Sequence, residues 1–248
     1  MKSVAPGLSI RLVSNSFSAV YFDCDSTLSS IEGVDQLLQF ADPDLRQDIA
    51  VLTDQAMNGT LPLAEVYETR LSKLAPSRDQ LNAVGEHYVR NLVPDAKETI
   101  MALQALGKHV GIVSGGLLIP VQRVAQHLGV PLDYVHAVPL LFSSDGRYRD
   151  FDRESPLWRN GGKVPVVKEA PDNHKPMVFV GDGITDLETM PHVGRFVGFG
   201  GVVAREVVRD GADYWVEAQS LASILPFILT KTETDTLRDS SRFRALLA

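Results

Sequence analysis

The chain has 248 residues, of which 44% are hydrophobic and 22% charged, and its formal net charge at pH 7 is -7. This composition is ordinary for a globular protein with one large α/β domain, or with a core and a smaller insert. The negative charge argues against a nucleic-acid-binding surface, and the single cysteine, Cys24, fits a reducing compartment. With no signal-peptide pattern and no apolar run of membrane-spanning length, we expect a cytoplasmic protein that binds neither nucleic acid nor membranes.

The first third of the chain passes from one strand into a long helical pattern. Residues 19–22 form a short apolar run, which predicts a buried strand that delivers Asp23 at its carboxyl end. From residue 29 to residue 91 the apolar residues recur at helical spacing. Ser77 and Gln80 have the spacing of a capping box, which predicts the start of the last helix in this stretch. We therefore expect residues 29–91 to contain helices and no strand.

After Pro94, predicted helices and strands alternate. The helices are expected at residues 97–106 and 119–128, each followed by a glycine, and the strands at residues 109–114, 175–180, 195–198 and 213–216. Asp145-Gly146 lies between β-prone residues and predicts a hairpin. The polar tail from Thr230 is typical either of a loosely ordered segment or of an added helix.

This alternation predicts the α/β fold class, with a parallel sheet covered by helices on both faces. We expect a Rossmann-like core formed by residues 1–28 and 92–248, interrupted by a helical-bundle cap at residues 29–91. In open α/β sheets, chemistry takes place beyond the carboxyl ends of the strands. Asp23, Ser114 and Asp182 each follow a predicted strand, so we expect them to meet in one crevice.

Carboxylates dominate two of these strand ends. Asp23 and Asp25 stand two residues apart, which is typical of a nucleophile with a general acid–base, although an Asp-rich turn gives the same pattern. Asp182 lies between two glycines, and Asp186 follows one helical turn later. Such carboxylates suit Mg²⁺, which prefers oxygen ligands, although an Asp-Gly turn explains either residue alone.

Two further positions fit phosphate chemistry. Ser114, with the following Gly115 and Gly116, can cradle an oxyanion through its hydroxyl and through backbone N–H groups, or can form an ordinary strand-to-helix turn. Lys163 precedes a predicted helix and can neutralise phosphate charge, although most lysines are simply surface residues.

In their order along the chain, these pieces resemble the haloacid dehalogenase superfamily. The pieces are Asp23-x-Asp25-x-Thr27, Ser114, Lys163 and Gly181-Asp-Gly-x-x-Asp186. Other motifs resemble the phosphoserine phosphatases of that superfamily, and the resemblance covers residues 17–215. These motifs are Glu32-Gly-Val-Asp35, Ala56-Met-Asn-Gly59, Arg70-Leu71, Pro76-Ser-Arg78, Gly161-Gly-Lys163, and Phe199-Gly-Gly201 followed by Arg205.

The resemblance implies a role for each of these residues. Asp23 is expected to be the nucleophile, Asp25 the general acid–base, and Lys163 a catalytic cation. Mg²⁺ would be bound by Asp23, Asp182 and the backbone carbonyl of Asp25. Glu32 would meet the ammonium group of the substrate and Arg70 its carboxylate. Other implied substrate contacts are Met57, Ser114, Gly115, Gly116 and Thr185, and the implied supporting residues are Thr27, Asp186 and Arg205.

The function that the resemblance implies is hydrolysis of a small phosphomonoester through an aspartyl-phosphate, with O-phosphoserine as the expected substrate, in serine biosynthesis. Asn58 and Leu63 depart from the family pattern near the expected substrate pocket. A phosphotransferase that passes the phosphoryl group to an alcohol such as homoserine is an alternative. A non-enzymatic phospho-acceptor signalling domain is another, but it would lack Asp25 and the cap. Both a monomer and a homodimer fit the sequence.

Overall fold

The computed structural model describes residues 13–57 and 63–247, apart from the side chains of residues 53–57 and 63. The expectations for the side chains of Met57, Asn58 and Leu63 therefore lie outside the described part. Six parallel strands form the central sheet in the order β3-β2-β1-β6-β7-β8. These strands are β1 (Ala19–Phe22), β2 (His109–Leu117), β3 (Val135–Val138), β6 (Met177–Gly181), β7 (Arg195–Phe199) and β8 (Tyr214–Val216).

Strand β1 occupies the middle of the sheet. It pairs with β2 on one side and with β6 on the other, and its four residues are all buried. A strand buried on both faces reads as a continuous apolar run, which is why residues 19–22 carry no alternation. The chain thus leaves the centre of the sheet at Asp23.

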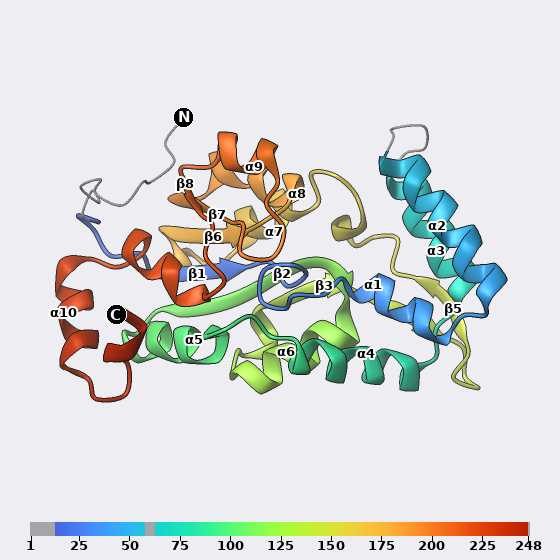
Figure 1. Ribbon diagram of the computed structural model, residues 1–248, viewed down its shortest axis with the longest axis horizontal. Helices are drawn as coiled ribbons and strands as arrows, with labels where there is room; N and C mark the ends of the chain where they lie inside the picture. Colours follow the sequence, from blue (N-terminus) through green and yellow to red (C-terminus); the bar gives the residue numbers. More distant parts are fainter. Residues whose placement is uncertain (1–12, 58–62, 248) are drawn as a thin grey trace.

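Helices cover both faces of the sheet (Figure 1). Helices α5 (Ala96–Ala105) and α6 (Leu118–Leu128) pack on one face, whereas α7 (Lys163–Glu169), α8 (Ile184–Leu187) and α9 (Glu206–Gly211) pack on the other. This is the α/β architecture with a parallel sheet that the sequence predicts. Short 3₁₀ helices complete the core: η2 (Leu132–Tyr134), η3 (Pro156–Trp158), η4 (Asp172–His174), η5 (Met190–His192), η6 (Leu221–Phe227) and η7 (Arg244–Leu247).

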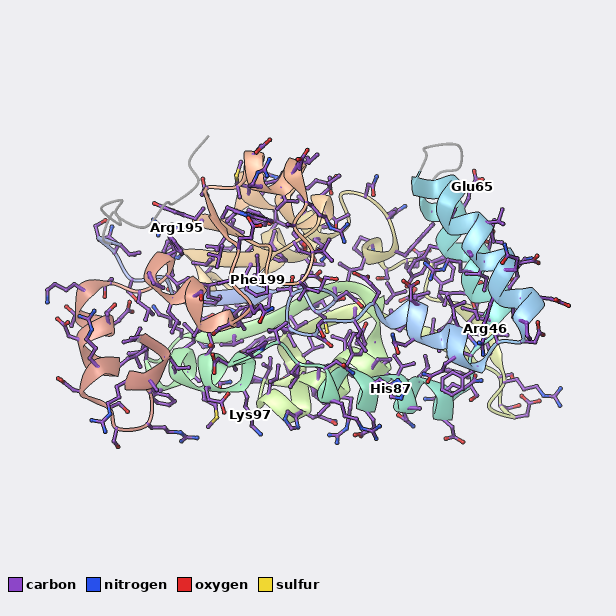
Figure 2. All side chains as sticks on the ribbon, in the orientation of Figure 1. Arg46, Glu65, His87, Lys97, Arg195 and Phe199 are labelled. Carbon is purple, nitrogen blue, oxygen red and sulfur yellow. The ribbon has the colours of Figure 1, made fainter. Side chains whose placement is uncertain are left out.

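Between β1 and α5 the described residues form helices and no strand. These are α1 (Gly33–Gln36), η1 (Leu37–Phe40), α2 (Pro43–Met57), α3 (Leu63–Leu74) and α4 (Arg78–Arg90). The predicted capping box of Ser77 and Gln80 is present at the start of α4. The α2–α3 pair, which carries Arg46 and Glu65, stands at the opposite end of the molecule from Arg195 of β7 (Figure 2).

The chain leaves and re-enters the sheet region at adjacent points, because an isolated bridge pairs Ser29 with Leu92. The helices from α1 to α4 are here called the helical block. Helix α4 packs along α6, so this block rests on the core. A domain boundary at residues 29 and 91 stays a prediction.

Two local features follow the expected patterns. The hairpin around Gly146 consists of β4 (Leu140–Phe142) and β5 (Tyr148–Phe151), which are antiparallel, and the φ of Gly146 is 81°. The tail from Thr230 contains an ordered helix, α10 (Lys231–Asp239), which begins with a capping box. Within residues 13–57 and 63–247, no helix has the length and apolar character needed to cross a membrane.

Strand β2 is longer than expected. The sequence predicts its end at Ser114, but the strand continues to Leu117, with a shift in its pairing to β3 between Val113 and Leu117. The two glycines at 115 and 116 weaken the sequence signal of a strand, although the backbone stays extended through them. The segment Ser114-Gly115-Gly116, which is expected to bind phosphate and is here called the phosphate cradle, therefore lies within the irregular end of β2.

Candidate active site

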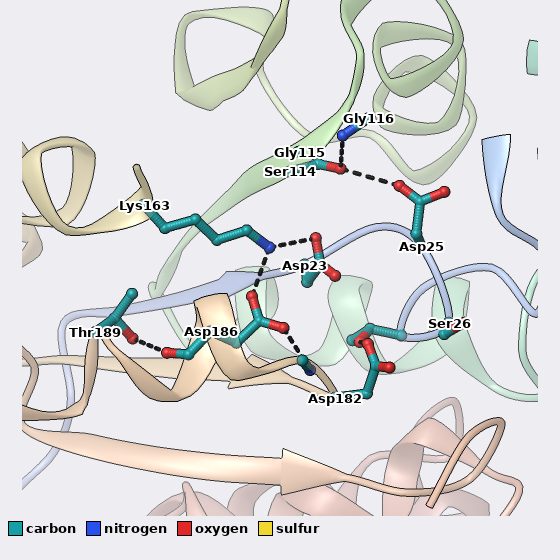
Figure 3. A network of polar contacts seen from close by, with 12 residues as sticks. Asp23, Asp25, Ser26, Ser114, Gly115, Gly116, Lys163, Asp182, Asp186 and Thr189 are labelled. Carbon is teal, nitrogen blue, oxygen red and sulfur yellow. Dashed lines mark hydrogen bonds and ion pairs between the residues drawn. The ribbon is translucent and has the colours of Figure 1, made fainter. Parts of the chain in front are cut away.

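Asp23 meets a buried lysine at the carboxyl edge of the sheet. Asp23 is 7% exposed, and its Oδ1 lies 2.7 Å from Nζ of Lys163, which begins α7 (Figure 3). The same Nζ donates a hydrogen bond to Oδ1 of Asp186 at 2.5 Å. Burial opposes the charged ammonium, but the carboxylates of Asp186 and Asp23 outweigh it and raise the pKa of Lys163. Lys163 therefore carries a fixed positive charge next to the expected nucleophile.

Three buried carboxylates gather at the same edge of the sheet. Asp23, Asp182 and Asp186 each offer one oxygen, and these oxygens lie within 4.8 Å of one another. Burial, together with the charge of Asp23, raises the pKa of Asp182 to about 8 and that of Asp186 to about 7. Three like charges at such separations call for a cation, and a set of hard oxygen donors suits Mg²⁺ or a similar ion. The chemistry of the donor set therefore fits a divalent metal.

Neighbouring side chains hold Asp182 in place. The hydroxyl of Thr27 donates to Oδ1 of Asp182 at 3.2 Å, and Nε of Arg205 donates to Oδ2 at 3.0 Å. Arg205 also lies 4.0 Å from Glu32, so it links the helical block to the acidic cluster. Thr27 and Arg205 thus both contact Asp182, and the supporting roles expected for them stay a prediction.

The turn around Asp186 depends on glycine. The N–H of Gly183 donates to Oδ2 of Asp186 at 2.8 Å, which caps the start of α8. A Cβ on Gly181 would lie 2.6 Å from Cβ of Asp186, so only glycine leaves room for this carboxylate. Thr185, expected to contact substrate, is half-buried on the same short helix.

Asp25 points away from the acidic cluster. One of its oxygens, Oδ1, accepts hydrogen bonds from the N–H of Gly33 at 2.6 Å and from the hydroxyl of Tyr88. The hydroxyl of Ser114 donates to the other oxygen, Oδ2, at 3.2 Å. Burial, then the charges of Glu32 and Asp23, raise the pKa of Asp25 to about 7. A carboxyl group with this pKa can both give and take a proton near neutral pH.

The Ser114-Gly115-Gly116 segment runs beside Asp25, as Figure 3 shows. Ser114 is fully buried, and its hydroxyl oxygen accepts from the N–H of Gly116 at 2.9 Å. The carbonyl oxygen of Gly115 accepts from the hydroxyl of Tyr67, on α3, at 3.3 Å. A Cβ on Gly116 would come within 2.7 Å of Oδ2 of Asp25. The backbone of this segment therefore lies close both to Asp25, the expected general acid, and to α3.

Glu32 and Arg70, the residues expected to recognise the substrate, both lie next to α1. Glu32 lies at the start of that helix, and its Oε1 accepts from the hydroxyl of Ser26 at 2.6 Å. Arg70, on α3, pairs with Asp35 one turn further along α1. Nε of Arg70 is buried and has no hydrogen-bond partner in the described structure. An unpaired guanidinium N–H is suited to a carboxylate ligand.

Sequence patterns missed two side chains of this site. Tyr88 lies on the apolar face of α4, where a tyrosine looks like a core residue, although a buried phenol usually has a hydrogen-bond partner. Ser26 lies between two candidate site residues, but no spacing rule connects it to Glu32. In both cases the contact depends on how α1 and α4 pack above Asp25.

Comparisons with known proteins find similar sequences and similar folds. The family model for haloacid dehalogenase-like hydrolases matches residues 20–191. The chain is 36% identical over 203 residues to a phosphoserine phosphatase of Bos taurus, covering 81% of this chain and 89% of that protein.

Solved structures are similar over most of the chain. A phospho-aspartyl intermediate analogue of phosphoserine phosphatase has a TM-score of 0.71 and 26% identity, and the match covers 87% of this chain and 100% of that one. A substrate-bound phosphoserine phosphatase complex has a TM-score of 0.72 and 25% identity, with the same coverage of 87% and 100%.

Proposed function

The chain belongs to the haloacid dehalogenase-like hydrolases and, among them, to the phosphoserine phosphatase family, and on that premise we propose that it hydrolyses O-phosphoserine to serine and phosphate. A phosphoserine phosphatase of Bos taurus and solved structures of such enzymes support this substrate. The reaction would proceed through an aspartyl-phosphate on Asp23 and would supply serine to amino-acid biosynthesis.

The contrast between Asp23 and Asp25 carries the proposal. Asp23 faces the cation of Lys163 at 2.7 Å, which suits a carboxylate that attacks a negatively charged phosphoryl group. Asp25 faces neutral donors and has a pKa raised to about 7, which favours a carboxyl group that can carry a proton. Pairs of carboxylates in contrasting surroundings commonly divide the nucleophile and acid roles in this way.

In the first step, an oxygen of Asp23 bonds to phosphorus as the bond from phosphorus to the serine oxygen breaks. Asp25 gives its proton to that oxygen, because a serine alkoxide is a poor leaving group. Lys163 and the hydroxyl of Ser114 would offset the negative charge of the phosphoryl group. Other side chains already hold both groups at the site, so little reorganisation is needed when the substrate binds.

In the second step, Asp25 takes a proton from a water molecule, and the water oxygen bonds to phosphorus as the bond to Asp23 breaks. We assign Mg²⁺ binding to Asp23, Asp182 and the backbone carbonyl of Asp25. When bound, the ion neutralises phosphate charge that would otherwise repel the nucleophile. Asp186 holds Lys163 at the site, which is the role proposed for its 2.5 Å hydrogen bond.

Substrate selection is assigned to the helical block. Glu32 would meet the ammonium group of phosphoserine, and the free Nε of Arg70 its carboxylate. Glu32 begins α1, and Arg70 reaches α1 from α3 through Asp35, so both charges lie next to this short helix. The backbone N–H groups near Gly115 and Gly116 would approach the phosphate, and Thr185 would line the same crevice.

A substrate screen tests the proposal. We expect phosphoserine to be preferred over phosphoethanolamine, which lacks the carboxylate, and over phosphoglycolate, which lacks the ammonium group. Equal turnover of all three would contradict recognition of an amino acid. Adding acceptor alcohols separates hydrolysis from transfer, because a phosphotransferase would form a new phosphomonoester instead of inorganic phosphate.

Arg70→Ala gives the matched test of the carboxylate contact. Loss of a charge-assisted hydrogen bond should lower kcat/KM for phosphoserine about 10- to 100-fold. Turnover of phosphoethanolamine should change little. Lys73→Ala is the control, because Lys73 lies on the same helix and pairs with Asp48 on the surface. Equal losses on both substrates would assign Arg70 to the fold rather than to the carboxylate.

A further inference from the structure

The hydroxyl of Tyr88 is a buried polar group with no part in the reaction steps above. Tyr88 is 0% exposed, and its phenol donates to Oδ1 of Asp25. An ordinary tyrosine ionises near pH 10, so at neutral pH the phenol is the donor and the carboxyl oxygen the acceptor. The backbone carbonyl of Tyr88 accepts from the hydroxyl of Ser29 at 3.1 Å. Tyr88 therefore ties helix α4 to both ends of the loop from Asp25 to Ser29.

Gly33 makes room for this phenol. A Cβ on Gly33 would lie 2.6 Å from Cζ of Tyr88 and nearer still to its hydroxyl oxygen, so any larger residue would displace the ring. The N–H of Gly33 donates to the same Oδ1 of Asp25 at 2.6 Å. Tyr88 and Gly33 thus form one unit, here called the Asp25 clamp.

The clamp makes the two oxygens of Asp25 unequal. Oδ1 accepts two hydrogen bonds, which occupy its two lone-pair directions. Oδ2 has the hydroxyl of Ser114 at 3.2 Å and faces the backbone of Gly116. A proton on Asp25 therefore finds a free lone pair on Oδ2, on the side where Ser114 and Gly116 lie.

Building on the proposed function, we propose that Tyr88 and Gly33 are positioning residues that place the transferable proton of Asp25 on Oδ2, beside the phosphate cradle. The proton on Oδ2 goes to the leaving oxygen as its bond to phosphorus breaks and the bond from Asp23 forms. Oδ2 then takes a proton from water as the water oxygen bonds to phosphorus and the bond to Asp23 breaks. Tyr88 keeps its own proton throughout.

Tyr88→Phe tests the clamp because it removes one oxygen and keeps the packed ring. Tyr21→Phe is the matched control: Tyr21 is 1% exposed on β1, and its hydroxyl pairs with Nδ1 of His174 at 2.8 Å, away from Asp25. Single-turnover phosphorylation of the protein is measured with phosphoserine, with glycerol phosphate and with p-nitrophenyl phosphate. The first two leave as alkoxides that need a proton, whereas nitrophenolate does not.

We expect Tyr88→Phe to slow phosphorylation by both alkyl phosphates about 10- to 100-fold and to leave the rate with p-nitrophenyl phosphate nearly unchanged. Gly33→Ala should give the same selective loss, because it displaces the phenol. In an Asp25→Asn background, Tyr88→Phe should add nothing further, since it acts through Asp25. Tyr21→Phe should match the wild type with every substrate.

Three results would overturn the clamp: equal slowing with alkyl and aryl phosphates, a Tyr88→Phe variant as fast as the wild type, or additive losses in the Asp25→Asn background. The glycerol phosphate measurement keeps this test separate from the choice of substrate. A wild type that uses glycerol phosphate and rejects phosphoserine contradicts the proposed substrate alone. A wild type that uses phosphoserine, with no selective loss in Tyr88→Phe, contradicts the clamp alone.

Discussion

Ser26 shows, at the residue scale, how a short side chain can orient a longer one. Its backbone has a φ of 53°, in the left-handed region, and its hydroxyl donates to Glu32 at 2.6 Å. Glu32 is exposed, so without this contact the proposed ammonium ligand would sample several rotamers.

Ser26→Ala should therefore weaken recognition of the ammonium group. We expect KM for phosphoserine to rise about fivefold, the value of one ordinary hydrogen bond, and kcat to stay close to that of the wild type. Turnover of phosphoglycolate should not change. Ser30→Ala is the control, since the hydroxyl of Ser30 donates to the carbonyl of Asn91 rather than to Glu32. An equal rise in KM for both substrates would place Ser26 with the phosphate instead.

The acidic cluster leads to a prediction about metal ions. Mg²⁺ keeps a strict octahedral geometry, whereas Ca²⁺ is larger and accepts both oxygens of one carboxylate. Ca²⁺ on Asp23 would engage the oxygen that has to attack phosphorus. Activity should be lost in EDTA, return with Mg²⁺, and fall when Ca²⁺ is added against fixed Mg²⁺. Full activity in EDTA, or equal activity with Ca²⁺ and Mg²⁺, would contradict the proposed role of the metal ion.

At the element scale, α10 is held to the core by a buried ion pair. Glu233 caps the start of the helix, and its Oε1 lies 2.6 Å from Nζ of Lys108, whose side chain is 2% exposed. Despite the opposing effect of burial, the hydrogen bonds from Lys108 and Ser16 lower the pKa of Glu233. The contact joins the C-terminal helix to the residue that precedes β2.

Glu233→Gln should lower the free energy of unfolding by about 1–2 kcal/mol near pH 7, because glutamine can still cap the helix but carries no charge for Lys108. A carboxylate whose pKa is lower in the folded state stabilises the fold above its unfolded pKa, near 4.5. The difference between variant and wild type should therefore shrink as the pH falls below about 4.5. Urea titrations at several pH values measure it.

Asp235→Asn is the control for Glu233→Gln. Asp235 lies on the same helix but pairs with the exposed Lys231, and surface pairs contribute little. A Glu233→Gln variant that is as stable as this control at pH 7 would show that the contact with Lys108 does not stabilise α10.

The elements differ in how far the sequence predicts them. Strand β1 and helix α4 follow from local signals, since an apolar run and a capping box need no distant partner. The extension of β2 through Gly115 to Leu117 depends on pairing with β3, which no local pattern shows. Likewise, Asp23 and Asp182 are predictable at strand ends, whereas the contact of Tyr88 with Asp25 depends on how α4 packs.

At the scale of the whole molecule, the topology explains how a chain with a net charge of -7 can bind a phosphate dianion. The parallel sheet brings the ends of β1, β2 and β6 to one edge, where Lys163 is buried among carboxylates. Arg205 and Arg70 approach from the two sides, one beside Asp182 and one from the helical block. These cations lie among the carboxylates, and the proposed Mg²⁺ would supply further positive charge, so the local arrangement of charges matters more for this ligand than the net charge.

The covalent step on Asp23 is the central claim, and locating the phosphoryl group tests it most directly. The Asp25→Asn variant should accumulate the intermediate, because water then lacks its base. The measurement is acid quenching of this variant during turnover of ³²P-labelled p-nitrophenyl phosphate, followed by digestion and identification of the labelled residue by mass spectrometry. We predict one acyl phosphate, on Asp23, and no label when Asp23 is also changed to Asn. Label on another residue, or label that survives the change at Asp23, would contradict it.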